Sequence, residues 1–389
     1  MTSAGPDPEA LAALGFAPRT TESGEAWVLD AVFPDSTPVV LPDAAAAGGG
    51  LRAFLTGSVP ADVRATDLLF LDTETTGLAG GAGTVAFLVG VAWWGSGGLH
   101  IRQIFLPTPG GEPALLAALA ESVAGFRVLV TYNGNAYDLP LLRSRGILSR
   151  RRDLFGDALS WDLLPAARRM WGRRLPDCRQ QSVERVTADI GRPAGDIEGS
   201  RIPQVWFDFV RGETRGQARG EAGGEMASVV DHNRYDLLGM TAILGALSIR
   251  ADSLEPTSAD PGLAWTECWS LARICERAGL RRAAADWIVL AREARDTGRL
   301  PAAADPRLEV FDRDSVRLLK RVADWSAVES ILRRFLESSP DSSWALREAA
   351  ILFEHRTVDL PSALDFARRL GEEKRIARIE NKLRRIAPE

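Results

Sequence analysis

Short apolar segments separated by turns constrain the fold of this chain more than any other feature. Leu68–Leu71, Val85–Trp94 and Leu99–Leu106 have the length and spacing of strands that follow one another across a sheet. The periodicity then changes, since Glu112–Ala124 predicts a helix and Val128–Tyr132 a fourth strand. Three meandering strands followed by alternating helix and strand predict an α/β fold, in which helices flank a mixed sheet.

The patterns before and after these segments predict the domain organisation. A long helix over Met226–Arg250 closes the α/β part, and Arg211–Glu225 before it has no large aliphatic residue, which predicts a mobile surface loop. Beyond a stretch rich in Asp, Ser, Pro and Gly the pattern is helical, in pairs such as Trp325–Leu336 and Trp344–Glu354. We therefore expect an N-terminal extension (1–65) with one strand at Ala26–Phe33, a mixed α/β domain (66–250), a linker (251–262) and an α-helical repeat domain (263–389).

Composition excludes several classes of protein. With 46% hydrophobic and 25% charged residues, the chain is an ordinary globular protein and not a disordered or fibrous one. Its longest apolar run, Val85–Trp94, is about half of the roughly 20 residues that a bilayer span needs, so no membrane segment is expected. The acidic N-terminus lacks the basic start of a secretory signal. Three cysteines without a CxxC pair favour a reducing, cytoplasmic location.

The net charge of −5 conceals an uneven distribution. Arg143–Arg185 contains eleven arginines against five acidic residues. Such a stretch can bind a polyanion even on an acidic protein, and the alternative is a solvated helix face. Trp161 and Trp171 lie in the same stretch and are candidates for stacking on nucleic-acid bases, although tryptophans more often pack in a core.

The first chemical motif is a pair of carboxylates at the end of a buried strand. Asp72 and Glu74 follow the apolar start of LLFLDTETTGL, Leu68–Leu78. Side chains two apart on a strand point to the same side, so these carboxylates converge. Their repulsion and their hard oxygen atoms favour Mg²⁺ or Mn²⁺. The alternative, acidic residues that end an exposed strand, is less consistent with the apolar run before them.

Two further motifs supply the other acidic residues. In TYNGNAYDLPLL, Thr131–Leu142, Asp138 lies in the first turn of a predicted helix, where an acid also suits the helix dipole. In DHNRYDLLGM, on the long closing helix, His232 and Asp236 are i and i+4 and share one face, whereas Tyr235 points about a quarter-turn away. An ordinary surface contact is the alternative for this pair. Taken with the first motif, the three segments predict a two-metal site for phosphodiester chemistry.

These motifs resemble those of the DEDD 3′–5′ exonuclease superfamily, which has the ribonuclease-H-like fold. The first motif is similar to the proofreading-subunit form, and the Asn-Ala-Tyr-Asp of the second to the form in proofreading DNA polymerases. Ser160–Val210, with WDLLPAARRMW, SVER and RIPQVWFDFV, resembles the YprB-like ribonuclease-H-like proteins, which also have a helical-repeat tail. Ala349–Ala367, AAILFEHRTVDLPSALDFA, resembles a tetratricopeptide unit. The resemblance covers about residues 65–250 and implies a ribonuclease-H-like sheet followed by an all-α domain.

The resemblance also implies an activity, namely a divalent-metal-dependent 3′–5′ exonuclease on single-stranded DNA or RNA with two Mg²⁺ or Mn²⁺ ions. The implied metal ligands are Asp72, Glu74, Asp138 and Asp236, and His232 would orient or deprotonate the attacking water. The residues implied in substrate binding are Thr75, Thr76, Gly77, Leu78, Asn135 and Tyr137. The chain departs from the superfamily in one respect. The superfamily has a tyrosine four residues before the last Asp or a histidine five before it, whereas here a histidine lies four before it.

Two other functions fit the same motifs. A catalytically weak or inactive nuclease-like domain could bind nucleic acid as a scaffold and dock a protein partner through the helical tail. Internal cleavage, as by ribonuclease H, shares the metal chemistry but not the His/Asp spacing on the last helix. The full set of four carboxylates favours the exonuclease, because a cluster of like charges is energetically unfavourable and a domain without catalytic activity gains nothing from it.

Overall fold

The computed structural model describes residues 6–34, 50–60, 62–77, 83–187, 192, 196–211, 217–252, 254–256, 263–297, 305 and 307–386. The chain divides into two compact units, Met1–Ser253 and Leu254–Glu389, and each is described by itself. The expected linker over 251–262 spans this division, but residues 253 and 257–262 of it lie outside the described residues. Its role as a hinge stays a prediction.

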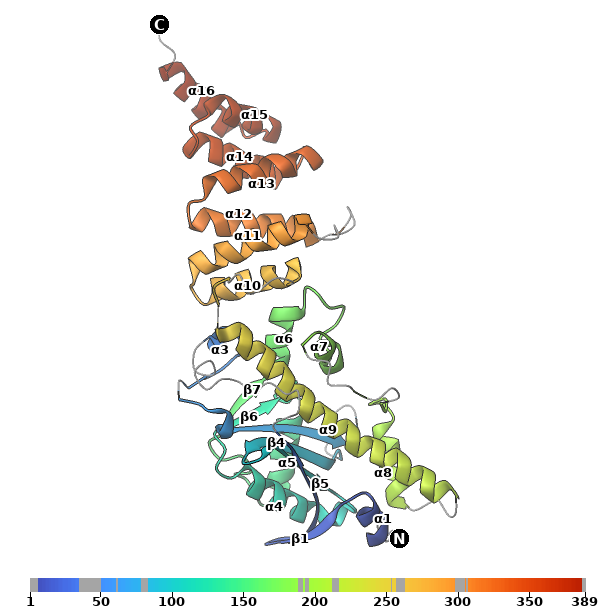
Figure 1. Ribbon diagram of the computed structural model, residues 1–389. Coiled ribbons are helices and arrows are strands. Elements are labelled where there is room, and N and C mark those ends of the chain that lie inside the picture. The colour runs from blue at the N-terminus through green and yellow to red at the C-terminus, as the bar shows by residue number, and fades with distance from the viewer. Residues whose placement is uncertain are drawn as a thin grey trace. The chain divides into compact units, whose positions relative to one another are not determined.

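A seven-stranded mixed sheet forms the centre of the first unit, with the strand order β1-β2-β5-β4-β3-β6-β7 (Figure 1). The strands are β1 (Ala17–Thr21), β2 (Gly24–Phe33), β3 (Leu68–Thr75), β4 (Ala86–Gly95), β5 (Gly98–Phe105), β6 (Val128–Thr131) and β7 (Leu159–Asp162). The pairs from β1 to β3 are antiparallel, and β3, β6 and β7 pair in parallel. The mixed sheet predicted from the apolar segments is confirmed.

The N-terminal segment belongs to this sheet. β2 pairs with β5 along most of its length, and β1 pairs with β2. Leu11, Phe16 and Val28 are buried in the same apolar core as the central strands. The expectation of a separate extension over 1–65 is therefore wrong. The strand at Ala26–Phe33 could not be placed from sequence, because its partner β5 lies far along the chain.

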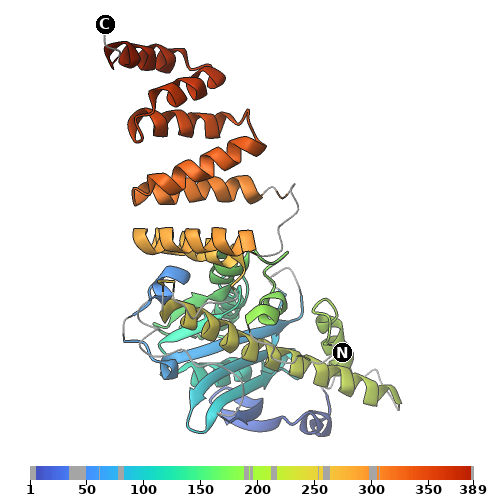
Figure 2. The same ribbon diagram turned by 45° about the horizontal axis from the view of Figure 1, so that its top comes forward.

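Helices lie on both faces of the sheet. Gln103 of β5 donates to the Val230 carbonyl of α9 (Gln217–Asp252) at 2.7 Å, whereas its neighbour Arg102 donates to Ser122 of α4 (Glu112–Val123) at 3.4 Å. Since successive strand residues point to opposite faces, α9 and α4 cover opposite sides (Figures 1 and 2). The other helices among the described residues of this unit are α1 (Pro8–Ala13), α3 (Leu51–Phe54), α5 (Asp138–Leu148), α6 (Leu163–Trp171), α7 (Gln180–Thr187), α8 (Ile202–Arg211) and the short 3₁₀ turns η1 (Ala65–Asp67) and η2 (Pro109–Gly111).

Helix α9 begins earlier than the sequence predicts. The expected loop Arg211–Glu225 is helical from Gln217 onwards, and residues 212–216 lie outside the described residues. Its Ala, Gln, Arg and Glu residues are good helix formers, and the glycines among them do not break the helix. The result is a single helix of 36 residues that crosses the sheet (Figure 2).

Two glycines allow α9 to approach its neighbours closely. A Cβ on Gly90 of β4 would overlap the Asn233 Oδ1 atom, and a Cβ on Gly239 of α9 would overlap the Glu184 Oε1 atom of α7. Neither position accommodates a side chain without a shift of its neighbours. Gly90 and Gly239 therefore determine how α9 lies on the sheet and against α7.

The described part of the second unit is all-α, as predicted. Its helices are α10 (Trp265–Arg277), α11 (Arg281–Thr297), α12 (Arg307–Arg321), α13 (Trp325–Ser338), α14 (Ser343–His355), α15 (Leu360–Leu370) and α16 (Glu373–Ile386). Each helix packs against the next along the chain. The tetratricopeptide-like character of this unit stays a prediction. Within the described residues of both units, no helix has the length and apolar character needed to cross a membrane.

Candidate active site

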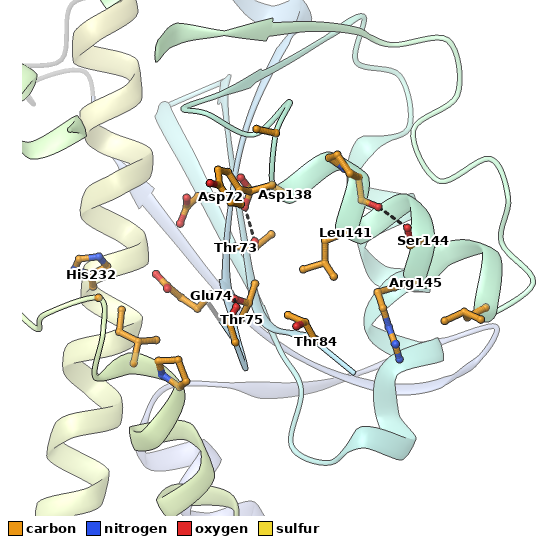
Figure 3. Close-up of a pocket in the computed structure, with 18 of the residues that line it drawn as sticks. Asp72, Thr73, Glu74, Thr75, Thr84, Asp138, Leu141, Ser144, Arg145 and His232 are labelled. Carbon is orange, nitrogen blue, oxygen red and sulfur yellow. Dashed lines mark hydrogen bonds between the residues drawn. The ribbon is translucent and has the colours of Figure 1, made fainter. Parts of the chain in front are cut away.

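A cleft of about 940 Å³ opens beside β3 and the first turn of α5 (Figure 3). Its polar lining comes from β3, α5, α9 and the segment before β4: Asp72, Thr73, Glu74, Thr75, Thr84, Asp138, Ser144, Arg145 and His232. Its apolar lining comes mainly from α5 and α8: Tyr137, Pro140, Leu141, Ile147, Leu148, Ile202 and Pro203. One cleft thus contains side chains from all three sequence motifs.

The carboxylates of the first motif lie on one side of β3, as the strand period predicts. Asp72 faces α9, where it accepts a hydrogen bond of 2.7 Å from Asn233 Nδ2. Glu74 points towards His232 (Figure 3) and is buried, and its Oε1 atom has no hydrogen-bond partner among the described residues. Thr73 lies between them and points the other way, towards α5. A buried carboxylate oxygen without a partner destabilises the folded protein unless a cation or a proton is bound to it.

Asp138, from the second motif, is the first residue of α5 and lies across β3 from the helix α9. Its Oδ1 atom accepts a hydrogen bond of 2.5 Å from Thr73 Oγ1. The turn before it has Asn133 at a φ of 66°, and buried Asp162 accepts a hydrogen bond of 2.7 Å from the Asn133 amide. Asp162 was not predicted from sequence, and it supports the turn that delivers Asp138.

His232 and Asp236, from the third motif, share one face of α9, as the i,i+4 spacing predicts. His232 Nε2 lies 3.4 Å from Asp236 Oδ2. One ligand atom from each of Glu74, His232 and Asp236 lies within 4.8 Å of the others. The donor set, two carboxylates and an imidazole, is one that binds divalent metal ions.

The electrostatics of the cluster favour a bound cation. Burial raises the pKa of Asp72 and of Glu74 well above the usual range, and the neighbouring carboxylates raise both further. The charges of Asp236 and Asp138 act on both residues. Burial also raises the pKa of Asp138, against the opposing effect of the hydrogen bond from Thr73. Together with the unpartnered Glu74 oxygen, these shifts show that the residues present fit hard divalent cations such as Mg²⁺ or Mn²⁺.

Polar residues that the motifs do not contain surround the cluster. The Arg192 guanidinium donates to Asp236 Oδ1 and pairs with buried Glu184, and Asp196 Oδ1 lies 2.8 Å from His232 Nδ1. No periodic pattern marks Arg192 or Asp196 in the sequence. Both stand singly among Gly, Ala, Pro and Ile residues, which give no signal of their role.

The predicted substrate-binding residues divide into two groups. Thr75, Gly77 and Tyr137 line the cleft, and Tyr137 is exposed. Thr76 instead binds the Val85 amide through its hydroxyl at 3.1 Å, and the exposed Asn135 accepts a hydrogen bond of 2.5 Å from Ser160 of β7. Thr76 and Asn135 are not among the residues that line the cleft. Leu78 lies outside the described residues.

The arginine-rich stretch is partly occupied by contacts within the protein. Arg145 pairs with Glu112, Arg151 pairs with Glu22, and Arg169 donates to the Phe54 carbonyl. Trp161 and Trp171 are buried and pack in the core, the alternative that the sequence favoured over stacking on bases. Because several of its arginines are paired within the protein, this stretch is weaker evidence for a nucleic-acid interface than the number of arginines alone suggests.

Comparison with known proteins agrees with this architecture. Residues 69–248 match the RNase_H superfamily. This part of the chain has the ribonuclease-H-like fold. Over 181 residues the chain is 34% identical to "Uncharacterized protein YprB" of Bacillus subtilis (strain 168). The aligned residues make up 46% of this chain and 41% of that protein. The match covers less than half of either protein. The matched residues 69–248 include every described residue of the predicted site.

Proposed function

We propose that this protein is a divalent-metal-dependent 3′–5′ exonuclease that hydrolyses phosphodiester bonds of single-stranded nucleic acid. The observation that carries the proposal is the meeting of four carboxylates and one histidine around β3. Asp72 and Glu74 come from β3, Asp138 from α5, and His232 and Asp236 from α9. Distant segments that converge on one cleft with repelling charges are characteristic of a metal-dependent hydrolytic site.

The arrangement supports distinct roles for the carboxylates. Asp72, Glu74 and Asp236 would hold one ion, and Asp138 would act on a second. Asp72 would be the shared ligand, since the charges of both Asp138 and Asp236 act on it, as they also do on Glu74. Two bound ions supply stabilisation of the attacking and leaving oxygens in an in-line displacement at phosphorus.

His232 is suited to the role of general base. Its Nδ1 atom faces the Asp196 carboxylate at 2.8 Å, so its Nε2 atom is directed at the acidic cluster. A positioned imidazole that accepts a proton from water typically contributes about 10² to 10⁴ in rate. Histidine in the position of the superfamily's tyrosine can therefore supply the same function.

The walls of the cleft favour a strand with unpaired bases. Tyr137, Ile147 and Leu148 on α5 are exposed along one wall. Arg145, in the same wall, is already held by Glu112 through a hydrogen bond of 2.6 Å from its Nε atom. Exposed aromatic and aliphatic surface binds the faces of bases, which a duplex hides. We therefore propose a single-stranded 3′ end as the substrate.

The proposal is tested with 5′-end-labelled single-stranded DNA and RNA, incubated with Mn²⁺, Mg²⁺ or EDTA. A 3′–5′ exonuclease shortens the labelled strand progressively from its far end, whereas internal cleavage yields scattered fragments at once. Asp72→Asn and Asp138→Asn should abolish hydrolysis, and Asp153→Asn, at an exposed residue outside the cleft, should not. Equal hydrolysis in EDTA, or by both active-site variants, would overturn the proposal.

A further inference from the structure

We infer that Arg192 and Asp196, which lie outside all three motifs, are positioning residues: Arg192 orients Asp236, and Asp196 orients His232. The inference rests on the proposed hydrolytic function of the site. It assigns a role to a segment between α7 and α8 that contributes neither a proposed metal ligand nor a base.

Asp196 fixes the ring of His232. Its Oδ1 atom lies 2.8 Å from His232 Nδ1, and its Oδ2 atom accepts hydrogen bonds from Arg192 Nη1 at 3.0 Å and Gln181 Nε2 at 3.1 Å. An ionised carboxylate only accepts hydrogen bonds, and Asp196 is the closer of the two carboxylates that face the ring, so the proton of the neutral imidazole is on Nδ1. The lone pair is then on Nε2, the atom that lies 3.4 Å from Asp236 Oδ2. Asp196 therefore sets both the tautomer and the direction of the proposed base.

Arg192 fixes the carboxylate of Asp236. Its Nε and Nη2 atoms donate to the two oxygens of Glu184 at 2.6 and 2.8 Å, and Nη2 also donates to Asp236 Oδ1. The planar guanidinium thus connects Glu184, Asp196 and Asp236 in one rigid geometry. Oδ1 of Asp236 is occupied by this contact, and Oδ2 is left to face His232 and the metal-binding cluster.

The surrounding contacts hold this network in place. Glu184 is buried, and its Oε1 atom accepts a further hydrogen bond from Gln180 Nε2 at 2.9 Å. Gln180 Nε2 also donates to the main-chain carbonyl of Asp236 at 2.7 Å. The close approach of Glu184 to α9 is possible because residue 239 is a glycine. Contacts of this kind, one step removed from the ligands, fix ligand orientation, and their loss typically costs 10- to 100-fold in activity or metal affinity.

The first experiment detects the tautomer of His232 without any need for catalysis. The full-length protein, metal-free and at alkaline pH, is labelled with ¹⁵N, and the imidazole resonances are recorded by NMR. The chain has 3 histidines, so His232→Gln identifies the signal of interest. We expect a single Nδ1–H tautomer in the wild type and in the control Asp153→Asn, and a mixture of tautomers in Asp196→Ala. In Asp196→Asn the single acceptor oxygen is needed by the donors Arg192 and Gln181, so the NH2 group should face His232 Nδ1 and favour the opposite tautomer, Nε2–H.

The second experiment separates orientation from folding. Arg192→Lys keeps the charge but loses the planar fork, and Arg201→Lys is the matched control, because Arg201 forms an exposed ion pair with Glu225. We expect Arg192→Lys and Asp196→Ala to lower the single-turnover rate at saturating Mn²⁺ by about 10- to 100-fold. The Mn²⁺ affinity of Asp196→Ala, measured by calorimetry, should remain close to that of the wild type, since Asp196 is not a proposed ligand.

The outcomes distinguish this inference from the proposed function. Wild-type protein with an Nε2–H tautomer, or Asp196→Ala with an unchanged single tautomer, would overturn the role of Asp196. A rate for Arg192→Lys equal to that of Arg201→Lys would overturn the role of Arg192. If the wild-type protein hydrolyses no substrate, the proposed function fails, and the NMR spectrum still decides whether Asp196 orients the ring.

Discussion

Asn233 Nδ2 donates a hydrogen bond of 2.7 Å to Asp72 Oδ2, and this contact joins helix α9 to strand β3. Asn233 is fully buried, and its Oδ1 atom accepts a hydrogen bond of 2.9 Å from Gln103 Nε2. The hydrogen bond from Asn233 lowers the pKa of Asp72, against the larger opposite effect of burial. Asn233 therefore connects the two elements and favours the charged form of a proposed ligand.

Replacement of Asn233 should destabilise the fold. Asn233→Ala leaves the buried Asp72 without its donor, and a buried polar group that loses its partner costs about 1–3 kcal/mol. Urea unfolding of the metal-free protein measures the change in the free energy of unfolding. Asn135→Ala is the control, because Asn135 contacts Ser160 at the surface. A loss no larger than that of the control would contradict the proposed importance of this contact.

The pH dependence of the free energy of unfolding should reveal that the charged form of Glu74 is unfavourable in the folded protein. Its folded-state pKa is raised, first by burial and then by Asp72, so the folded protein holds this proton more tightly than the unfolded chain. The contribution of Glu74 to the free energy of unfolding therefore falls as the pH rises from the ordinary Glu pKa, about 4.3, towards the raised value. Glu74→Gln does not ionise, so its melting temperature should exceed that of the wild type by an amount that grows across this window.

Two controls belong to that measurement. Glu121→Gln removes one carboxylate that forms an ion pair with Arg19 at the surface. The difference in melting temperature between this variant and the wild type should not grow as the pH rises. Saturating Mn²⁺ should raise the melting temperature of the wild type more than that of Glu74→Gln, because a bound cation replaces the proton. A melting temperature of metal-free Glu74→Gln below that of the wild type at neutral pH would show that the charged Glu74 carboxylate does not destabilise the folded protein.

His232 and Tyr235 should differ sharply in their effect on the reaction. His232→Ala should lower the single-turnover rate by about 10² to 10⁴, the usual contribution of a positioned general base. Tyr235→Phe should lower the rate much less, because Tyr235 points about a quarter-turn away from the helix face that His232 and Asp236 share. Both rates are measured at saturating Mn²⁺, so that weaker metal binding does not pass for loss of the base. A larger effect of Tyr235→Phe would assign His232 a structural role.

The first unit should act without the second. All three motifs precede Ser253, where the chain divides into two compact units. A chain that ends at this residue should fold, as judged by circular dichroism and a cooperative thermal transition, and should hydrolyse short oligonucleotides at a rate similar to that of the whole chain. The second unit should affect long substrates or partners. A folded but inactive first unit would show that the helical unit contributes to the site.

The parts of the site that could be predicted from sequence depend on local periodicity. A strand period places Asp72 with Glu74, and a helical period places His232 with Asp236. Asn233 could not be assigned in the same way, because its function comes from a contact with a strand 161 residues away. The strand at Ala26–Phe33 could not be assigned to the sheet for a similar reason, since the pairing of β2 with β5 depends on distant residues and leaves no local pattern.

Two pairs of residues of the proposed site are built on separate elements, with the ligands Asp72 and Glu74 on β3 and the base His232 and the ligand Asp236 on α9. The spacing within each pair is set by the period of its own strand or helix, whereas the gap between the pairs depends on how far α9 lies from the sheet. Gly90 sets the lower limit of that gap. Oxygen ligands lie about 2.0–2.1 Å from Mg²⁺ but 2.3–2.6 Å from Ca²⁺, so the separation of the two pairs decides which ion they can bind. Residue 90 contacts no ligand ion, yet its size would govern the ionic radius that the protein accepts.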